Sequence, residues 1–182
     1  MDKQDSGSMN RQLFFKTLLV LTVALAMATF LFACTRSADH KIIGVGDRAH
    51  EIRLQSVDGK TVSLADYHGK VVLVHFWATW CPPCVEEIPT LERFSQQVSG
   101  TDIVVLAISV DKSADALKTF LDKNKLHLPV LRDPGGKTAG SYGTTKFPET
   151  YVVGRDGMVR YKVIGPMDWS LRTNVEIIRS LL

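Results

Sequence analysis

The stretch VVLVHFWATWCPPCVEEIP, residues 71–89, decides the fold because a strand pattern, a cysteine pair and a helix start follow one another within it. Residues 71–78 are almost continuously apolar and rich in valine, which is typical of a strand buried on both faces of a sheet. Two cysteines then enclose two prolines, and the residues after them have helical periodicity. The stretch therefore predicts a buried strand that ends in a CxxC pair at the start of a helix.

The helix predicted after the cysteines has one apolar side, formed by Ile88, Leu91, Phe94 and Val98. Pro89 lies within this stripe. Because proline lacks a backbone N–H and its ring crowds the preceding turn, we expect it to kink the helix.

Two hairpin signals lie on either side of this unit. Residues 51–64 hold two short alternating runs around Asp58-Gly59, a dipeptide that supplies the positive φ angles of a tight turn. Asp156-Gly157 divides residues 149–165 in the same way. Each segment therefore predicts a pair of antiparallel strands.

The elements between and after these signals are read from periodicity. Residues 102–110 predict a second buried strand, and residues 113–125 an amphipathic helix with Ser113 as its N-cap. The side chains expected on its buried face are Ala116, Leu117, Phe120 and Leu121. Residues 127–133 predict a short strand, and residues 134–143 a loop with about one helical turn. A helix closes the chain within residues 167–182, with one face made of Leu171, Val175, Ile178 and Leu182.

This order of elements predicts an α/β fold. A strand, a helix and a strand in succession imply a right-handed parallel unit, and the later hairpin adds antiparallel strands. We therefore expect a mixed sheet with helices on both faces.

Cys81 and Cys84 lie where the strand ends and the helix begins. A thiolate there meets the positive end of the helix dipole and unpaired backbone N–H groups. We expect Cys81 at the exposed tip and Cys84 shielded one turn inward. Such a pair suits disulfide exchange: Cys81 attacks a substrate disulfide, Cys84 resolves the mixed disulfide, and a separate donor reduces the pair again.

Pro82 and Pro83 affect the redox poise of the pair. They stiffen the loop but have no N–H groups to donate to the Cys81 sulfur. A less stabilised thiolate makes the dithiol a stronger reductant. The sequence therefore predicts a reducing pair.

The N-terminal segment reads as an export signal. Residues 18–34 carry no charge and follow Arg11 and Lys16, so residues 1–34 predict a signal peptide or an uncleaved membrane anchor. The box LFAC resembles a bacterial lipoprotein cleavage site, with Cys34 as the lipidated residue. Residues 35–45 predict a polar linker and residues 46–182 the folded domain, which is tethered to a membrane in either case.

The cysteine count and the charge exclude other classes of protein. The chain has three cysteines and no second CxxC, so it lacks the ligands of a structural zinc site and the pairs of a disulfide network. A net charge of +3 is too small a bias to indicate a nucleic-acid partner.

FWATWCPPC is very similar to the active-site segment of thioredoxins, and the resemblance extends over residues 46–182. Three features narrow it to the membrane-tethered, extracytoplasmic family of TlpA and ResA type, which includes the cytochrome c maturation thioredoxins. They are the N-terminal hairpin, the extra segment between Asp111 and Phe147, and CPPCVEEIP with Glu87 and Pro89. The resemblance implies a thioredoxin-like mixed sheet flanked by helices, with an N-terminal β-hairpin and an insertion before the cis-proline loop.

The resemblance also implies an activity and a location. It implies a thiol:disulfide reductase in the bacterial cell envelope, with its domain on the periplasmic or extracytoplasmic side. Its substrates would be protein disulfides, with apocytochrome c the best candidate. A membrane thiol transporter of DsbD or CcdA type would reset it, and no cofactor or metal is implied.

Further site residues come from the same resemblance. KFPET, residues 146–150, matches the cis-proline loop, so Pro148 is expected in the cis form opposite the dithiol, with Phe147 offering backbone hydrogen bonds to a substrate chain. Trp80, Pro82 and Pro83 would shape the contact surface. Glu87 lies on the same helix face as Cys84, where its carboxylate could take up the proton of that thiol or raise its pKa. The alternative is a helix-surface glutamate that stabilises the helix dipole.

His75 is a departure from the family. Thioredoxins have a buried aspartate at the matching position, and the narrower family often has asparagine. A neutral imidazole there could relay a proton or help the thiolates hold a metal. The alternative is a hydrogen-bonded core histidine.

Three rival functions follow from these residues. One is an envelope disulfide oxidase or isomerase, which the CxxC spacing alone does not separate from a reductase. Another is a peroxide reductase. That chemistry requires a threonine and a proline arranged just before the reactive cysteine, and here Thr79 lies two residues before Cys81 but no proline precedes it nearby. The third is a copper-handling protein, for which His75 is the hint and the short cysteine spacing is a counter-argument.

Overall fold

The computed structural model describes residues 16–23, 25–27 and 42–182. The chain divides into two compact units, Met1–Asp39 and His40–Leu182. In the first unit residues 16–23 and 25–27 are helical, and no helix in the described ranges is long and apolar enough to cross a membrane. The LFAC box with Cys34 and residues 35–41 of the predicted linker lie outside the described residues.

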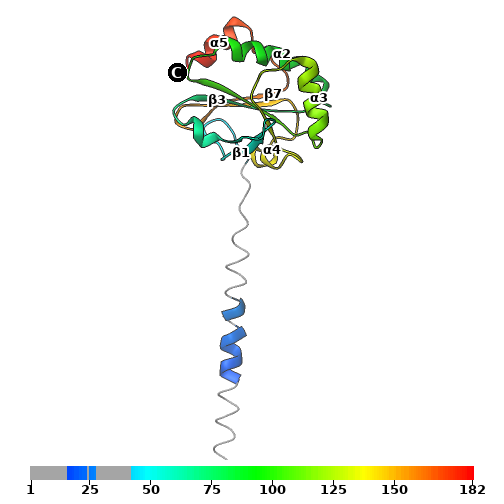
Figure 1. The fold of residues 1–182 in the computed structure, drawn as a ribbon. Coiled ribbons are helices and arrows are strands. Elements are labelled where there is room, and N and C mark those ends of the chain that lie inside the picture. Colours follow the sequence, from blue (N-terminus) through cyan, green and yellow to red (C-terminus); the bar gives the residue numbers. More distant parts are fainter. Residues whose placement is uncertain (1–15, 24, 28–41) are drawn as a thin grey trace, which may run out of the picture. The chain divides into compact units, whose positions relative to one another are not determined.

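The described part of the second unit is built on one seven-stranded mixed sheet (Figure 1). Its strand order is β2-β1-β5-β4-β3-β6-β7, with β3, β4 and β5 parallel and the outer neighbours antiparallel. The strands are β1 Arg53–Ser56, β2 Thr61–Ser63, β3 Val71–Trp77, β4 Ile103–Ser109, β5 Val130–Arg132, β6 Glu149–Val153 and β7 Val159–Ile164. The predicted thioredoxin-like mixed sheet and N-terminal hairpin are confirmed.

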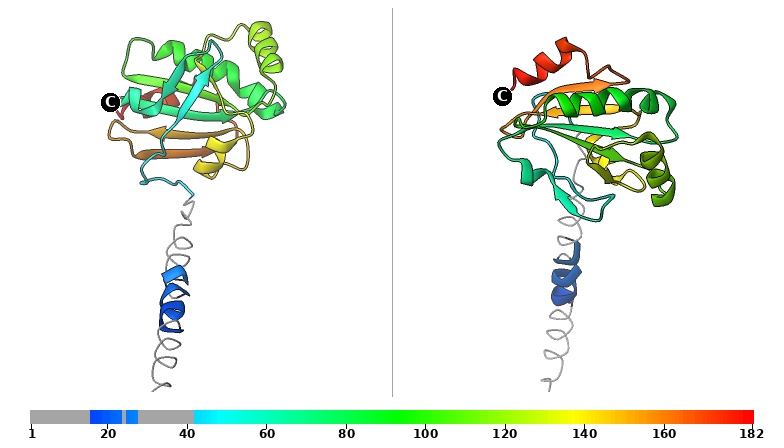
Figure 2. Two further views of the ribbon diagram at one scale, coloured as in Figure 1. Left: turned by 60° about the horizontal axis from the view of Figure 1, so that its bottom comes forward. Right: turned by 45° about the horizontal axis from the view of Figure 1, so that its top comes forward.

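Helices cover both faces of this sheet (Figure 2). They are η1 Leu64–Tyr67, α2 Pro82–Gln97, α3 Ala114–Asn124, α4 Lys137–Tyr142 and α5 Arg172–Arg179. His75 of β3 faces Glu87 of α2, whereas the next residue, Phe76, packs against Tyr142 of α4. Since successive strand residues point to opposite faces, α2 and α4 lie on opposite sides of β3.

The predicted central unit agrees with the structure. All residues of β3 are buried, as expected for a strand covered on both faces. Prolines occupy the first two positions of α2, where no intrahelical N–H bond is needed. The predicted stripe from Ile88 to Val98 is buried, and α2 continues through Pro89.

Two helices differ from their predictions. The side chain of Ser113 caps α3 as expected, but Ala116 is exposed and Leu117 is the fully buried residue of that helix. The last helix, α5, begins only at Arg172, and both Leu171 and Leu182 are about half exposed. A turn in which the Asp168 carboxylate accepts from the N–H and hydroxyl of Ser170 delays the helix start, and Trp169, buried just before it, supplies the core contact instead.

The packed domain also begins before Gly46. Ile43, inside the predicted linker of residues 35–45, is buried in the core, and its carbonyl oxygen accepts a hydrogen bond from Lys162. The folded unit therefore reaches at least to this residue.

Candidate functional site

Cys81 and Cys84 form a disulfide at the point where β3 ends and α2 begins, with their Cα atoms 5.3 Å apart. Cys84 is fully buried, as expected. The prediction that Cys81 is exposed is wrong for this oxidised state, because the residue is only 6% exposed. Its sulfur lies 3.6 Å from the carbonyl oxygen of Phe147, so the loop of residues 146–150 covers it.

The cis-proline loop lies against the disulfide. The Phe147–Pro148 peptide is cis, as the resemblance implies. The ring of Trp80 meets the ring of Phe147 edge-on with centroids 6.0 Å apart, and Trp80 is 63% exposed. Pro82 is exposed and Pro83 half-buried beside them. These side chains form an accessible apolar rim around a covered disulfide.

The loop between β3 and the cysteines is fixed by Asp111, just beyond β4. The buried Asp111 carboxylate accepts hydrogen bonds from the Thr79 N–H at 3.0 Å, from the Thr79 hydroxyl at 2.6 Å and from the Ser109 hydroxyl at 2.7 Å. The hydroxyl of Thr79 is thus engaged with Asp111. This anchor holds the segment that leads directly into Cys81.

Glu87 is buried one helical turn after Cys84. Its Oε1 accepts hydrogen bonds from the indole N–H of Trp169 and, at 3.2 Å, from the backbone N–H of Met167. Burial raises the pKa of Glu87 from its usual 4.5 to about 7, and these two hydrogen bonds oppose that rise. A carboxyl group with a pKa near 7 can accept or release a proton near neutral pH.

His75 lies on β3 beneath the same region and is fully buried. Its Nδ1 is 2.8 Å from the hydroxyl of Thr150, and its Nε2 is 4.0 Å from Oε2 of Glu87. The second distance is short enough for an ion pair. However, burial lowers the pKa of His75 from 6.5 to about 3, so the imidazole is neutral near pH 7 and the contact is between a neutral ring and a carboxyl group.

Three partners of the site are missing from the sequence-based predictions: Asp111, Thr150 and Trp169. Glu87 and Trp169 are 82 positions apart, and His75 and Thr150 are 75 positions apart. No local motif links such residues. The available signal was Trp169 itself, a large aromatic side chain in the short segment ahead of the last helix.

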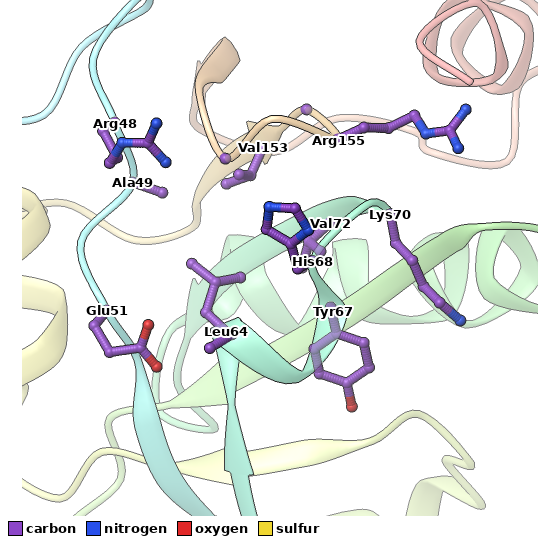
Figure 3. Close-up of a pocket in the computed structure, with 13 residues that line it drawn as sticks. Arg48, Ala49, Glu51, Leu64, Tyr67, His68, Lys70, Val72, Val153 and Arg155 are labelled. Atoms are coloured by element: carbon purple, nitrogen blue, oxygen red, sulfur yellow. The ribbon is translucent and has the colours of Figure 1, made fainter.

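A separate cleft of about 380 Å³ lies near the opposite end of β3, beside Val72 (Figure 3). Arg48 and His68 border it, but the side chains of Lys70 and Arg155 point away from its centre. It contains none of the predicted site residues. Within the described ranges, no group of three or more His, Cys, Asp or Glu side chains is placed to hold a metal ion.

Comparisons with known proteins agree with this geometry. The AhpC/TSA family profile matches residues 45–162. The thiol-disulfide oxidoreductase ResA of Oceanobacillus iheyensis is 32% identical over 162 residues, which cover 87% of this chain and 83% of the relative.

Solved structures give the same result. The exposed lipoprotein thioredoxin of Streptococcus pneumoniae is 30% identical with a TM-score of 0.64, over 72% of this chain and all of that one. A thioredoxin-family thiol:disulfide interchange protein of Chlorobium tepidum is 25% identical with a TM-score of 0.64, over 76% of this chain and 97% of that one.

Proposed function

Since the chain belongs to the AhpC/TSA family and is a thiol-disulfide oxidoreductase of the ResA type, we propose that it is a membrane-tethered reductase of protein disulfides outside the cytoplasm. The observation that carries the reductase direction is the start of α2. Cys81 occupies the N-cap position, and in the disulfide form its side chain accepts no capping hydrogen bond. Pro82 and Pro83 have no N–H to donate, so the backbone N–H of Cys84 is the nearest donor left at this end of the helix. A thiolate at Cys81 is therefore stabilised by the helix dipole but by few direct donors, which favours a reducing pair.

The reaction requires a reduced dithiol at Cys81 and Cys84. The Cys81 thiolate attacks a substrate disulfide, forms a mixed disulfide and releases one substrate thiolate. Cys84 then loses its proton and attacks the Cys81 sulfur, which breaks the mixed bond and releases the second substrate thiolate. Two electrons pass to the substrate, and the released thiolates take protons from solvent. Glu87, with His75 beside it, is the proposed proton acceptor for Cys84.

The rim around the disulfide suits an extended protein substrate. Trp80 and Phe147 offer an accessible apolar contact, and the cis-proline loop passes within 3.6 Å of the Cys81 sulfur. Apocytochrome c, which carries a cysteine pair, is the proposed substrate. A membrane thiol transporter of DsbD or CcdA type is the proposed electron donor.

The tether rests on the N-terminal sequence. Residues 18–34 are uncharged after a basic flank, and LFAC offers Cys34 for lipidation. The pneumococcal relative is described as an exposed lipoprotein, which supports the same location for this domain.

The deciding experiment is the reduction potential of the Cys81–Cys84 pair, measured by equilibrating the protein in thiol redox buffers. We expect a value near or below that of thioredoxin, ~−270 mV. A value above ~−180 mV would instead indicate an oxidase or isomerase and would overturn the proposal.

A further inference from the structure

Residues 166–169, which we call the Trp169 loop, are hydrogen-bonded to α2 at Glu87 and Thr90. The hydroxyl of Thr90 accepts a hydrogen bond from the backbone N–H of Trp169 at 3.1 Å and donates one to the carbonyl oxygen of Glu87 at 2.9 Å. Trp169 is fully buried, and its ring meets that of Phe94 edge-on at 6.1 Å. The position of Trp169 is therefore fixed by a backbone hydrogen bond and by the packing of its ring.

This fixed indole determines the orientation of the carboxyl group. Oε1 of Glu87 accepts from the Trp169 indole and the Met167 N–H, so the group cannot rotate without breaking two hydrogen bonds. Oε2 is left directed toward His75, 4.0 Å away. Thr150 holds the other side of that imidazole.

Glu87 is buried but also borders a small surface cleft of about 210 Å³ between α2 and the Trp169 loop. Two further acids, Glu86 and Asp168, line this cleft, and both are exposed. The Glu87 side chain is therefore buried but lies next to a surface cleft with two exposed acids.

We propose that Trp169 is a positioning residue for the resolving step: its indole N–H holds the Glu87 carboxylate in the orientation in which it takes up the proton of the Cys84 thiol. This rests on the proposed function. In that step the S–H bond of Cys84 breaks and an O–H bond forms on Glu87. The Cys84 thiolate then displaces the substrate thiolate from the Cys81 sulfur.

The role has a measurable consequence. A hydrogen bond to a carboxylate stabilises its charged form, so losing the indole bond disfavours ionisation of Glu87. The titratable groups near Glu87 are His75 from β3, at 4.0 Å, and Glu86 and Asp168, which line the same cleft. Cys84 lies three residues earlier on α2, a spacing that puts two side chains on one helix face. In the oxidised protein the cysteines do not titrate, so the carboxyl group can be followed without them.

The experiment is a carbon-13 NMR titration of the Glu87 carboxyl group in the oxidised full chain, with and without Trp169→Phe. We expect the substitution to move the midpoint upward by about one pH unit. Trp77→Phe is the matched control. It truncates an equally buried tryptophan whose ring nitrogen has no hydrogen-bond partner within the described residues, so the midpoint should stay in place.

An unchanged midpoint in Trp169→Phe, or equal shifts in both variants, would overturn the inference. If Trp169→Phe does not fold, the indole N–H resonances of the unsubstituted protein provide the same test. The chemical shift of the Trp169 indole N–H should change with pH at the midpoint of the Glu87 titration, and that of Trp77 should not. A Trp169 chemical shift that does not change at this midpoint would also overturn the inference. None of these readouts depends on the reduction potential, so the inference and the proposed function fail separately.

Discussion

At the scale of single residues, Glu87 and His75 reverse the protonation states that they have in an unfolded chain. Between pH 4.5 and 6.5 an unfolded chain ionises the carboxyl group and protonates the imidazole, whereas the fold keeps both neutral because burial raises one pKa to about 7 and lowers the other to about 3. In the folded protein the proton is on Glu87 and in the unfolded chain it is on His75, so the two residues together bind one proton in both cases. Their two contributions to the pH dependence of stability therefore cancel in this range.

Glu87→Gln should remove this cancellation. His75 then remains as a group whose folded pKa is depressed, so the unfolded chain binds the extra proton and stability falls as the pH falls below 6.5. As the pH rises from 4.5 to 6.5, we expect the free energy of unfolding of the oxidised protein to increase by up to about 1.4 kcal/mol per pH unit. Urea denaturation at a series of pH values would measure this slope.

His75→Asn should give a slope of the opposite sign. Glu87 then remains with a raised pKa, so its stabilising contribution is complete below pH 4.5 and is lost as the pH rises toward 7. The same urea series should show the free energy of unfolding falling by up to about 1.4 kcal/mol per pH unit as the pH rises. Two variants with identical profiles would show that these residues do not form the described pair.

At the scale of elements, the loop from β3 into α2 depends on an acceptor at the end of β4. Three donors converge on the two carboxylate oxygens of Asp111. Asp111→Asn replaces one oxygen with an amide that faces these donors, so we expect a loss of about 2 kcal/mol in the free energy of unfolding. Asp102→Asn, at an exposed residue 3.9 Å from Lys70, should change it by less than about 0.5 kcal/mol. Urea denaturation of both variants tests this, and equal losses would contradict the anchor.

Prediction from the sequence succeeded for the elements in which the apolar positions of the pattern are also the buried positions of the structure. β3, β4 and α2 pack with most of their apolar residues inside, so their patterns were sufficient. The pattern of α5 was misleading because a turn at Asp168 delays the helix and the buried Trp169 packs in place of Leu171. In the site, the CxxC pair was found from its place between a strand and a helix, whereas His75, Glu87, Phe147 and Pro148 were found through the family resemblance. Their partners Thr150, Asp111 and Trp169 meet them only through tertiary packing, which no local pattern encodes.

At the scale of the whole molecule, the described contacts of the disulfide and of the buried Glu87 and His75 all come from the second compact unit, His40–Leu182. A fragment of residues 40–182 should therefore have the same reduction potential and the same urea midpoint as the full chain. Redox-buffer equilibration and urea denaturation of both forms check this. A fragment with a shifted potential would mean that the N-terminal unit takes part in the redox chemistry.

The bond between Trp169 and Glu87 joins residues 82 positions apart, and this has a consequence for the newly made chain. Synthesis proceeds from the N-terminus, so both cysteines leave the ribosome well before Thr150 and Trp169 exist. During that interval they are ordinary peptide thiols, because Thr150 and Trp169, which hold His75 and Glu87 in place in the fold, have not yet been made. The nascent chain therefore carries a reactive but unspecialised dithiol, which becomes an active site only when the C-terminal part of the chain has folded onto it.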